Sequence, residues 1–247
     1  MDPIRRTALL VPLTWSLATV PAVLSTAFAA TQGSGKIATE ARTVPEFEAV
    51  STSDAIDLQV RQGAQQSLQV QADDNLLPLL ETVVEAHNGV PTLHVRWKHG
   101  ESIRTRSKVA LTVVVPRLSA LSMSGSGETR VESFTTPALQ VALSGSGNAQ
   151  LQNLSTDELA IHVSGSSDVT GSGKAGKIKV SISGSGNVRL TALHADDAQV
   201  RIAGSGDAAV FADKTLDVRI AGSGDVTYTG NATVTSSLAG SGSVTRK

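Results

Sequence analysis

The amino-acid sequence predicts an all-β protein: a parallel β-helix, or β-solenoid, of about seven coils of 18–20 residues, preceded by an N-terminal β cap of hairpins. Three observations predict this fold class. Of the 22 glycines, 17 lie in residues 120–247, where a glycine motif recurs every 18–20 residues. The segments between the motifs alternate apolar and polar residues, which is typical of half-buried strands. The chain has no cysteine and only 3% aromatic residues, so its core must consist of stacked aliphatic side chains.

Residues 1–29 have the three parts of a secretory signal peptide. Arg5 and Arg6 precede an apolar stretch, and Ala27-Phe28-Ala29 supplies the small residues expected before a cleavage site. A transmembrane anchor is the alternative, but two prolines interrupt the stretch. We therefore expect export to the periplasm or cell surface of a bacterium, with no membrane span after removal of the signal. Residues 30–43 are predicted to form a polar linker.

Residues 44–119 are predicted to form a β-rich cap that belongs to the same domain as the repeats. Short alternating segments around turn residues indicate two hairpins, and a continuous apolar run indicates a strand that leads into the first coil. These segments are 55–61 with 67–71, 82–86 with 92–97, and 109–115. The cap is expected because the end coils of a solenoid must be covered to prevent aggregation.

A Gly-Ser-Gly motif marks one corner in each coil of residues 120–247. Its first glycines are Gly125, Gly145, Gly165, Gly184, Gly204, Gly222 and Gly240; the third copy reads Gly-Ser-Ser. Apolar residues stand two, four and six positions before these glycines in nearly every copy. Glycine supplies the positive φ that a tight corner requires. Because one such unit cannot bury its apolar face alone, successive coils are expected to stack.

The cap and repeat motifs, taken in order, resemble a known family. They are Val44-Pro45-x-Phe47-x-x-Val50, Asp74-Asn75-Leu76-Leu77, Val113-Val114-Val115-Pro116-x-Leu118-x-x-Leu121 and the Ser-Gly-Ser-Gly ladder. Over residues 44–247 the chain is similar to the "putative autotransporter adhesin, head GIN domain" proteins of bacterial envelopes. The resemblance implies a β-helix-like fold and export, and it supplies no catalytic residues. Because no autotransporter barrel follows Lys247, we do not expect self-secretion.

Composition and spacing argue against several other functions. A formal net charge of −1 does not suit a nucleic-acid-binding protein. The segment 171–177 resembles a phosphate-binding loop, but Ile178 stands where a Ser or Thr would bind Mg²⁺. The five histidines have no metal-ligand spacing, so we expect no metal and no cofactor. Asp207 and Asp225 are interpreted as turn residues, with a weak cation site as the alternative.

The outward face of the first strand in each coil is the predicted ligand-binding surface. Polar residues recur there one coil apart and form a flat array, which suits a repetitive polymer better than a small enclosed ligand. The candidate residues are His162, Lys179, Gln199, Arg201, Asp217 and Arg219. A basic cluster in the cap is interpreted either as a solvated hairpin or as a contact for an anionic glycan. It comprises Arg96, Lys98, Arg104, Arg106 and Lys108.

These features predict an exported, non-enzymatic envelope protein that acts as a binding, adhesion or structural module. The expected partner is a cell-surface or envelope polysaccharide, not a nucleic acid, and no catalytic residue is predicted. The alternative is a polysaccharide-active β-helix enzyme, which rests on fold analogy alone. A cleft with clustered Asp, Lys and Arg would favour the enzyme, whereas a smooth polar face would favour binding. The sequence leaves the ligand and the oligomeric state open.

Overall fold

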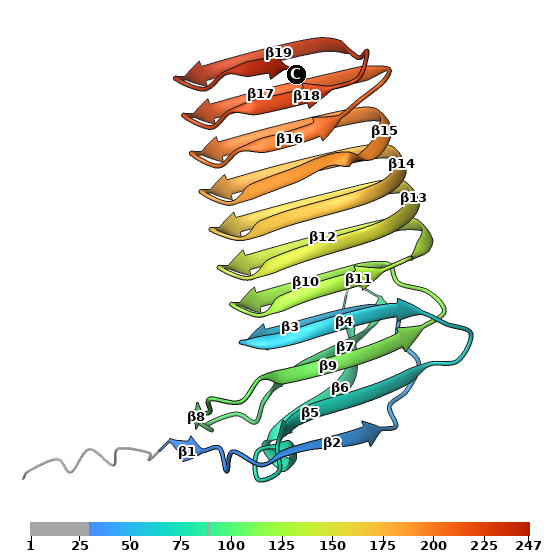
Figure 1. Cartoon of the computed structure of the whole chain (residues 1–247), viewed down its shortest axis with the longest axis vertical. Coiled ribbons are helices and arrows are strands. Elements are labelled where there is room, and N and C mark those ends of the chain that lie inside the picture. Colours follow the sequence, from blue (N-terminus) through green and yellow to red (C-terminus); the bar gives the residue numbers. More distant parts are fainter. Residues whose placement is uncertain (1–29, 88) are drawn as a thin grey trace, which may run out of the picture.

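The computed structural model describes residues 30–87 and 89–247, so the predicted signal peptide of residues 1–29 lies outside the described residues. The described chain is a stack of coils on an N-terminal β cap (Figure 1). This arrangement confirms the predicted all-β solenoid. The seven glycine corners enclose about six complete turns.

The cap is built from short strands around one 3₁₀ turn. Its elements are β1 (Thr31–Gln32), β2 (Ile37–Arg42), β3 (Ala49–Asp54), β4 (Ile56–Gln62), β5 (Ser67–Asp73), η1 (Leu77–Leu79), β6 (Leu80–His87), β7 (Val90–Trp97), β8 (Ile103–Arg104) and β9 (Val109–Val115). The predicted hairpin of 82–86 with 92–97 is confirmed, because β6 and β7 pair antiparallel. Within the part of the chain that the structure describes, no helix has the length and apolarity needed to cross a membrane.

The predicted hairpin of 55–61 with 67–71 is wrong, because another strand lies between its two arms. The apolar run 109–115 is confirmed as strand β9, which pairs in parallel with β4 and antiparallel with β5. Four residues, 63–66, connect β4 to β5 and can span the roughly 9.6 Å of two strand spacings. Every second residue of β9 is buried, and this apolar face favours a central place in the sheet.

The prediction of a polar linker at residues 30–43 is also wrong, since most of this segment joins the cap. Strand β2 pairs antiparallel with β5, and β1 pairs in parallel with β8. Each of these two strands lies at a sheet edge and is held by backbone hydrogen bonds to a single neighbour. Such a strand does not need the apolar alternation by which the other strands are predicted. Arg42, at the end of β2, also donates from Nη2 to the carbonyl oxygen of Leu77 at 2.7 Å.

The solenoid is built from strands that pair only in parallel with the coil before and the coil after. They are β10 (Ala120–Gly125), β11 (Glu128–Glu132), β12 (Thr135–Gly145), β13 (Asn148–Gly165), β14 (Asp168–Gly184), β15 (Asn187–Gly204), β16 (Ala208–Phe211), β17 (Thr215–Gly222), β18 (Val226–Thr229), β19 (Thr233–Gly240) and β20 (Val244–Arg246). In the cap, β3 and β4 already form a layer of this kind, because they pair in parallel with β10 and β11.

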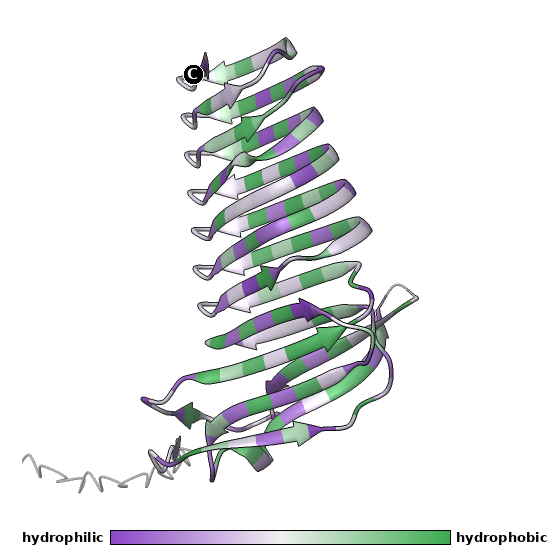
Figure 2. Cartoon of the chain, turned by 45° about the vertical axis from the view of Figure 1, so that its right-hand side comes forward, coloured by the Kyte–Doolittle hydropathy of each residue, from purple (hydrophilic) through white to green (hydrophobic). Residues whose placement is uncertain are grey.

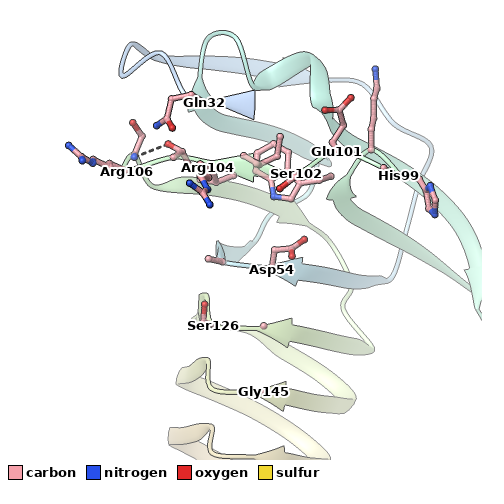
Figure 3. Close-up of a pocket in the computed structure, with 18 of the residues that line it drawn as sticks. Gln32, Asp54, His99, Glu101, Ser102, Arg104, Arg106, Ser126 and Gly145 are labelled. Carbon is pink, nitrogen blue, oxygen red and sulfur yellow. Dashed lines mark hydrogen bonds between the residues drawn. The ribbon is translucent and has the colours of Figure 1, made fainter. Parts of the chain in front are cut away.

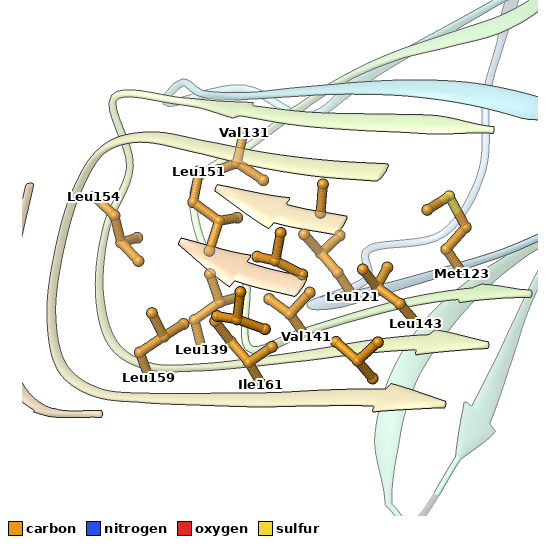
Figure 4. Close-up of a cluster of buried hydrophobic side chains, with 14 of the residues drawn as sticks. Leu121, Met123, Val131, Leu139, Val141, Leu143, Leu151, Leu154, Leu159 and Ile161 are labelled. Carbon is orange, nitrogen blue, oxygen red and sulfur yellow. The ribbon is translucent and has the colours of Figure 1, made fainter. Parts of the chain in front are cut away.

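Aliphatic columns fill the interior of the coils. Hydrophobic and hydrophilic bands alternate along the strands (Figure 2). The apolar side chains point into the space between the two layers of strands (Figure 4). One column consists of Leu121, Val141, Ile161, Val180, Val200 and Val218, all of them buried. The burial of such columns depends on stacking. Leu238, which follows Ile220 in a neighbouring column, lies in the last coil and is 46% exposed because no further coil covers it.

The glycine corners are places where successive backbones come too close for a side chain. Gly204 has a φ of +135°, and a Cβ there would lie 2.4 Å from the carbonyl oxygen of Gly184. The amide of Ser205 donates to that same oxygen at 2.9 Å. Glycine is therefore required at this position both for its backbone conformation and for the close approach. The serine side chains at the corners are exposed.

We expect Val200→Asp to unfold the solenoid, because Val200 is fully buried and stacks on Val180 and Val218. An unpaired carboxylate there should lower the free energy of unfolding by more than about 4 kcal/mol. Ala203→Asp is the matched control, since Ala203 is exposed on the same strand. Thermal denaturation measures both, and a parent-like transition for Val200→Asp would contradict this register.

We also expect Gly204→Ala to destabilise the coil by about 1–3 kcal/mol, through the contact with the neighbouring carbonyl and the strained φ. Ser205→Ala should leave the free energy of unfolding nearly unchanged, because that side chain is exposed. Chemical denaturation of the two variants compares adjacent residues of one corner. Equal stability of the two would show that the close approach at the glycine can relax without cost.

Candidate functional site

The six predicted ligand-binding residues lie on one surface, which we call the ladder face. Lys179, Gln199 and Asp217 are direct neighbours in one column of successive coils. The adjacent column contains His162 and Arg201, with Ser181 between them, and continues to Arg219. All six side chains are exposed or half-buried. The structure thus brings the predicted residues together, while their role in binding stays a prediction.

Most charges on the ladder face are neutralised by a neighbour. Lys179 pairs with Glu158 of the coil before, and the hydrogen bond from this lysine lowers the pKa of the Glu158 carboxyl. Asp217 accepts a hydrogen bond from Gln199 Nε2 at 3.1 Å and pairs with Arg219 at 3.5 Å. The guanidinium of Arg201 makes no ion pair or hydrogen bond with the other described residues.

A second surface, which the sequence did not locate, is a groove of about 1260 Å³ between the cap and the first two glycine corners. We call it the cap groove (Figure 3). The segment between β7 and β9 forms one wall, and the serines Ser126 and Ser146 lie on the other side. The charged side chains that line it are Asp54, Lys98, Glu101, Arg104 and Arg106.

The structure divides the basic cluster that the sequence singled out. Arg96 pairs with Glu81 and Glu85 of β6, and Lys108 pairs with Asp57. The other three, Lys98, Arg104 and Arg106, line the cap groove. They form no ion pair with any described residue.

Asp73, at the end of β5, holds the wall of the cap groove in place. Its side chain is 1% exposed, and its carboxylate accepts hydrogen bonds from Ser107 Oγ at 2.7 Å, from the Gly35 amide at 3.0 Å, and from Thr105. The hydrogen bond from Thr105, followed by that from Ser107, lowers the pKa of Asp73 against the opposing effect of burial. Sequence reasoning missed this residue, because its partners lie more than 30 positions away along the chain.

The acidic and amide residues that follow each corner act as backbone acceptors. Asp207 Oδ1 accepts the amide of Asp225 at 2.8 Å, and Asp225 Oδ1 accepts the amide of Ser243 at 2.9 Å. This geometry supports the interpretation of both as turn residues. Among residues 30–87 and 89–247, no group of three or more His, Asp or Glu side chains could hold a metal ion. Residues 171–177 lie inside strand β14, so the segment that resembles a phosphate-binding loop lacks the required helix.

The fold defines the class of this protein as a capped parallel β-solenoid. The family model described as "Putative auto-transporter adhesin, head GIN domain" matches residues 46–232. The chain belongs to this family.

Solved structures from Bacteroides fragilis and Parabacteroides distasonis have the same fold. A "putative adhesin" from Bacteroides fragilis is 24% identical and has a TM-score of 0.80; the match covers 88% of this chain and 100% of that chain. A "putative lipid binding protein" from Parabacteroides distasonis is 23% identical, with a TM-score of 0.74 and coverage of 89% and 100%. A comparison with curated proteins found no match.

We expect Asp73→Asn to destabilise the protein at neutral pH and to matter less in acid. The pKa of Asp73 in the folded state lies below its unfolded value of about 3.9. Its carboxylate therefore stabilises the fold above about pH 4, and this contribution is lost as the pH falls through the folded-state pKa. The difference in unfolding free energy between wild type and variant should be about 1–3 kcal/mol at pH 7 and should shrink toward pH 2.

Denaturant titrations at several pH values measure this difference. The contributions of other carboxylates cancel, because both proteins contain them. Asp213→Asn is the control: Asp213 is exposed, and its carboxylate makes no hydrogen bond with the described residues. A difference between wild type and Asp73→Asn that does not change with pH would contradict the role given to the Asp73 charge.

Proposed function

We propose that this chain is an exported, non-enzymatic binding module of the bacterial envelope, and that its ladder face contacts a cell-surface or envelope polysaccharide. The family description names an adhesin, and the names of similar structures refer to adhesion and lipid binding. These names support a binding role in general and a location at the envelope or outside the cell. Export also rests on the signal peptide predicted for residues 1–29.

The observation that carries the proposal is the register of the ladder face. Lys179, Gln199 and Asp217 are direct neighbours in consecutive coils, so donors and acceptors repeat at about 4.8 Å along the solenoid axis. A repetitive polymer can satisfy such a periodic array at several places simultaneously, and many weak contacts then add up through multivalency.

Arg201 is the strongest single donor on this surface. Eight of the eleven arginines in the described residues have an ion pair or a side-chain hydrogen bond; the other three are Arg104, Arg106 and Arg201. An exposed guanidinium has five donors in a fixed plane and is suited to hydroxyl and carboxylate oxygens. With Gln199 and Arg219 beside it, Arg201 is the centre of the proposed contact.

The enzyme alternative receives less support from the geometry. The cap groove does combine Asp54 and Glu101 with Lys98 and two arginines, as an enzyme would require. However, both carboxylates are exposed, whereas a general acid for glycoside hydrolysis is normally shielded from water so that it stays protonated. We therefore assign binding, not hydrolysis, to this protein.

A glycan array tests the ladder face. We expect the full chain to bind a subset of bacterial polysaccharides, and Arg201→Ala with Arg219→Ala to reduce that binding at least tenfold. The control is Arg130→Ala with Arg189→Ala, which removes two charges from the second strands of the coils, where Arg130 and Arg189 pair with Glu128 and Asp168. Thermal denaturation of both double variants confirms that they fold.

Three results would contradict the proposal. Equal loss of binding in both double variants would indicate a general charge effect and not a contact at the ladder face. Binding to phospholipid vesicles, without binding to any polysaccharide, would assign the surface to lipid. Release of reducing sugar from a bound polysaccharide would instead establish the enzyme alternative.

A further inference from the structure

The cap groove is lined by cationic side chains that form no ion pair with other described residues. Lys98, Arg104 and Arg106 are exposed there and form no ion pair within the described residues. Two carboxylates also line the groove, those of Asp54 and Glu101. Both already accept hydrogen bonds, from Ser53 Oγ at 3.1 Å and from Thr31 Oγ1 at 3.5 Å. With three cations and two carboxylates, the lining has a net charge of +1, and the guanidinium donors of its two arginines are unused.

The wall that carries these cations is held at several points. Arg104 pairs with Gln32 in the short β1–β8 sheet, and its carbonyl oxygen accepts the Gly33 amide at 2.8 Å. Thr105, between the two arginines, donates to the buried carboxylate of Asp73. Ser107, directly after Arg106, also donates to Asp73, so both residues that follow the arginines are fixed to this carboxylate. Figure 3 shows the Arg104 side chain pointing toward the stack of corners, with the Asp54 corner between it and Ser126. The backbone that carries these donors is therefore fixed before binding, so that only the arginine side chains lose conformational freedom when a ligand binds.

The opposite side of the groove offers hydroxyl groups. Ser126 and Ser146 are exposed, and their amides already donate to the carbonyl oxygens of Asp54 and Gly125. Their hydroxyls have no hydrogen-bond partner among the described residues, so they are available to a ligand. The same exposed column continues along the solenoid through Ser166, Ser185, Ser205, Ser223 and Ser241. A half-buried indole, Trp97, also lines the groove.

We infer that the cap groove binds an acidic saccharide. The carboxylates of an oligouronate would accept hydrogen bonds from Arg104, Arg106 and Lys98 at separate points along the groove, since a guanidinium can donate two parallel hydrogen bonds to a carboxylate. Sugar hydroxyls would pair with Ser126 and Ser146, and the apolar face of a pyranose ring would pack on Trp97. A volume of about 1260 Å³ exceeds that of a single small anion and is sufficient for an oligosaccharide. This inference is independent of the ladder face, because the two surfaces share no residue.

Calorimetric titration of the full chain with trigalacturonate tests the inference. Arg104→Gln with Arg106→Gln should weaken binding at least tenfold, and Ser126→Ala with Ser146→Ala should weaken it about threefold or more. The matched control is Arg61→Gln with Arg117→Gln, which removes the same charge from ion-paired arginines elsewhere in the cap and should change the affinity less than twofold. Wild-type affinity should fall as salt rises from 50 to 300 mM, because the contact is ionic.

Galactotriose and inorganic phosphate complete the comparison. Binding of neutral galactotriose as tightly as trigalacturonate would overturn the assignment to an acidic ligand. Binding of phosphate alone as tightly as trigalacturonate would overturn the assignment to a saccharide. Unchanged affinity in the Arg104/Arg106 variant would overturn the site itself. The ladder-face variant at Arg201 and Arg219 should bind trigalacturonate like wild type, so failure of one proposal is distinguishable from failure of the other.

Discussion

The close approach of each glycine corner to the corner below it is the constraint on which the rest of the structure depends. A Cβ at Gly145 or at Gly204 would lie 2.4 Å from the carbonyl oxygen of the preceding corner glycine, so that a side chain there would force the two backbones apart. The same approach lets each corner serine amide donate to that oxygen at 2.8–3.0 Å between successive repeats. Because every corner is bound to the one before, the core columns and the polar columns keep one register throughout the solenoid.

The cap starts this register with different residues. Asp54 occupies the corner position below Gly125 and has a φ of +66°, a conformation that Asp adopts more readily than most residues. The cap also covers the apolar end of the stack, which would otherwise be an open sheet edge. Its β7–β9 segment extends along the first corners and creates the cap groove. Protection of the solenoid end and formation of a ligand-sized groove thus result from one arrangement.

Ion pairing between neighbouring strands explains which charges remain available. On a surface built from parallel strands, side chains of successive coils lie side by side, so pairs such as Lys179 with Glu158 and Lys214 with Asp196 form readily. Such exposed pairs add little to the free energy of unfolding. An exposed cation without a partner therefore lowers the stability of the fold only slightly. The arginines without a partner in the described residues lie on the ladder face and in the cap groove, which are the two surfaces with a geometric reason to bind a ligand.

The sequence by itself determined the solenoid, its corners, its core columns and the grouping of six polar residues on one face. It could do so because each of these features follows from a local period that stacking repeats. Only the tertiary structure decided the cap, where β9 lies between β4 and β5 and the segment expected to be a linker becomes β2. The cap groove likewise depends on Asp73, whose contacts with Gly35, Thr105 and Ser107 join segments far apart in the chain. Such pairings have no period, and only the packing of the whole cap selects them.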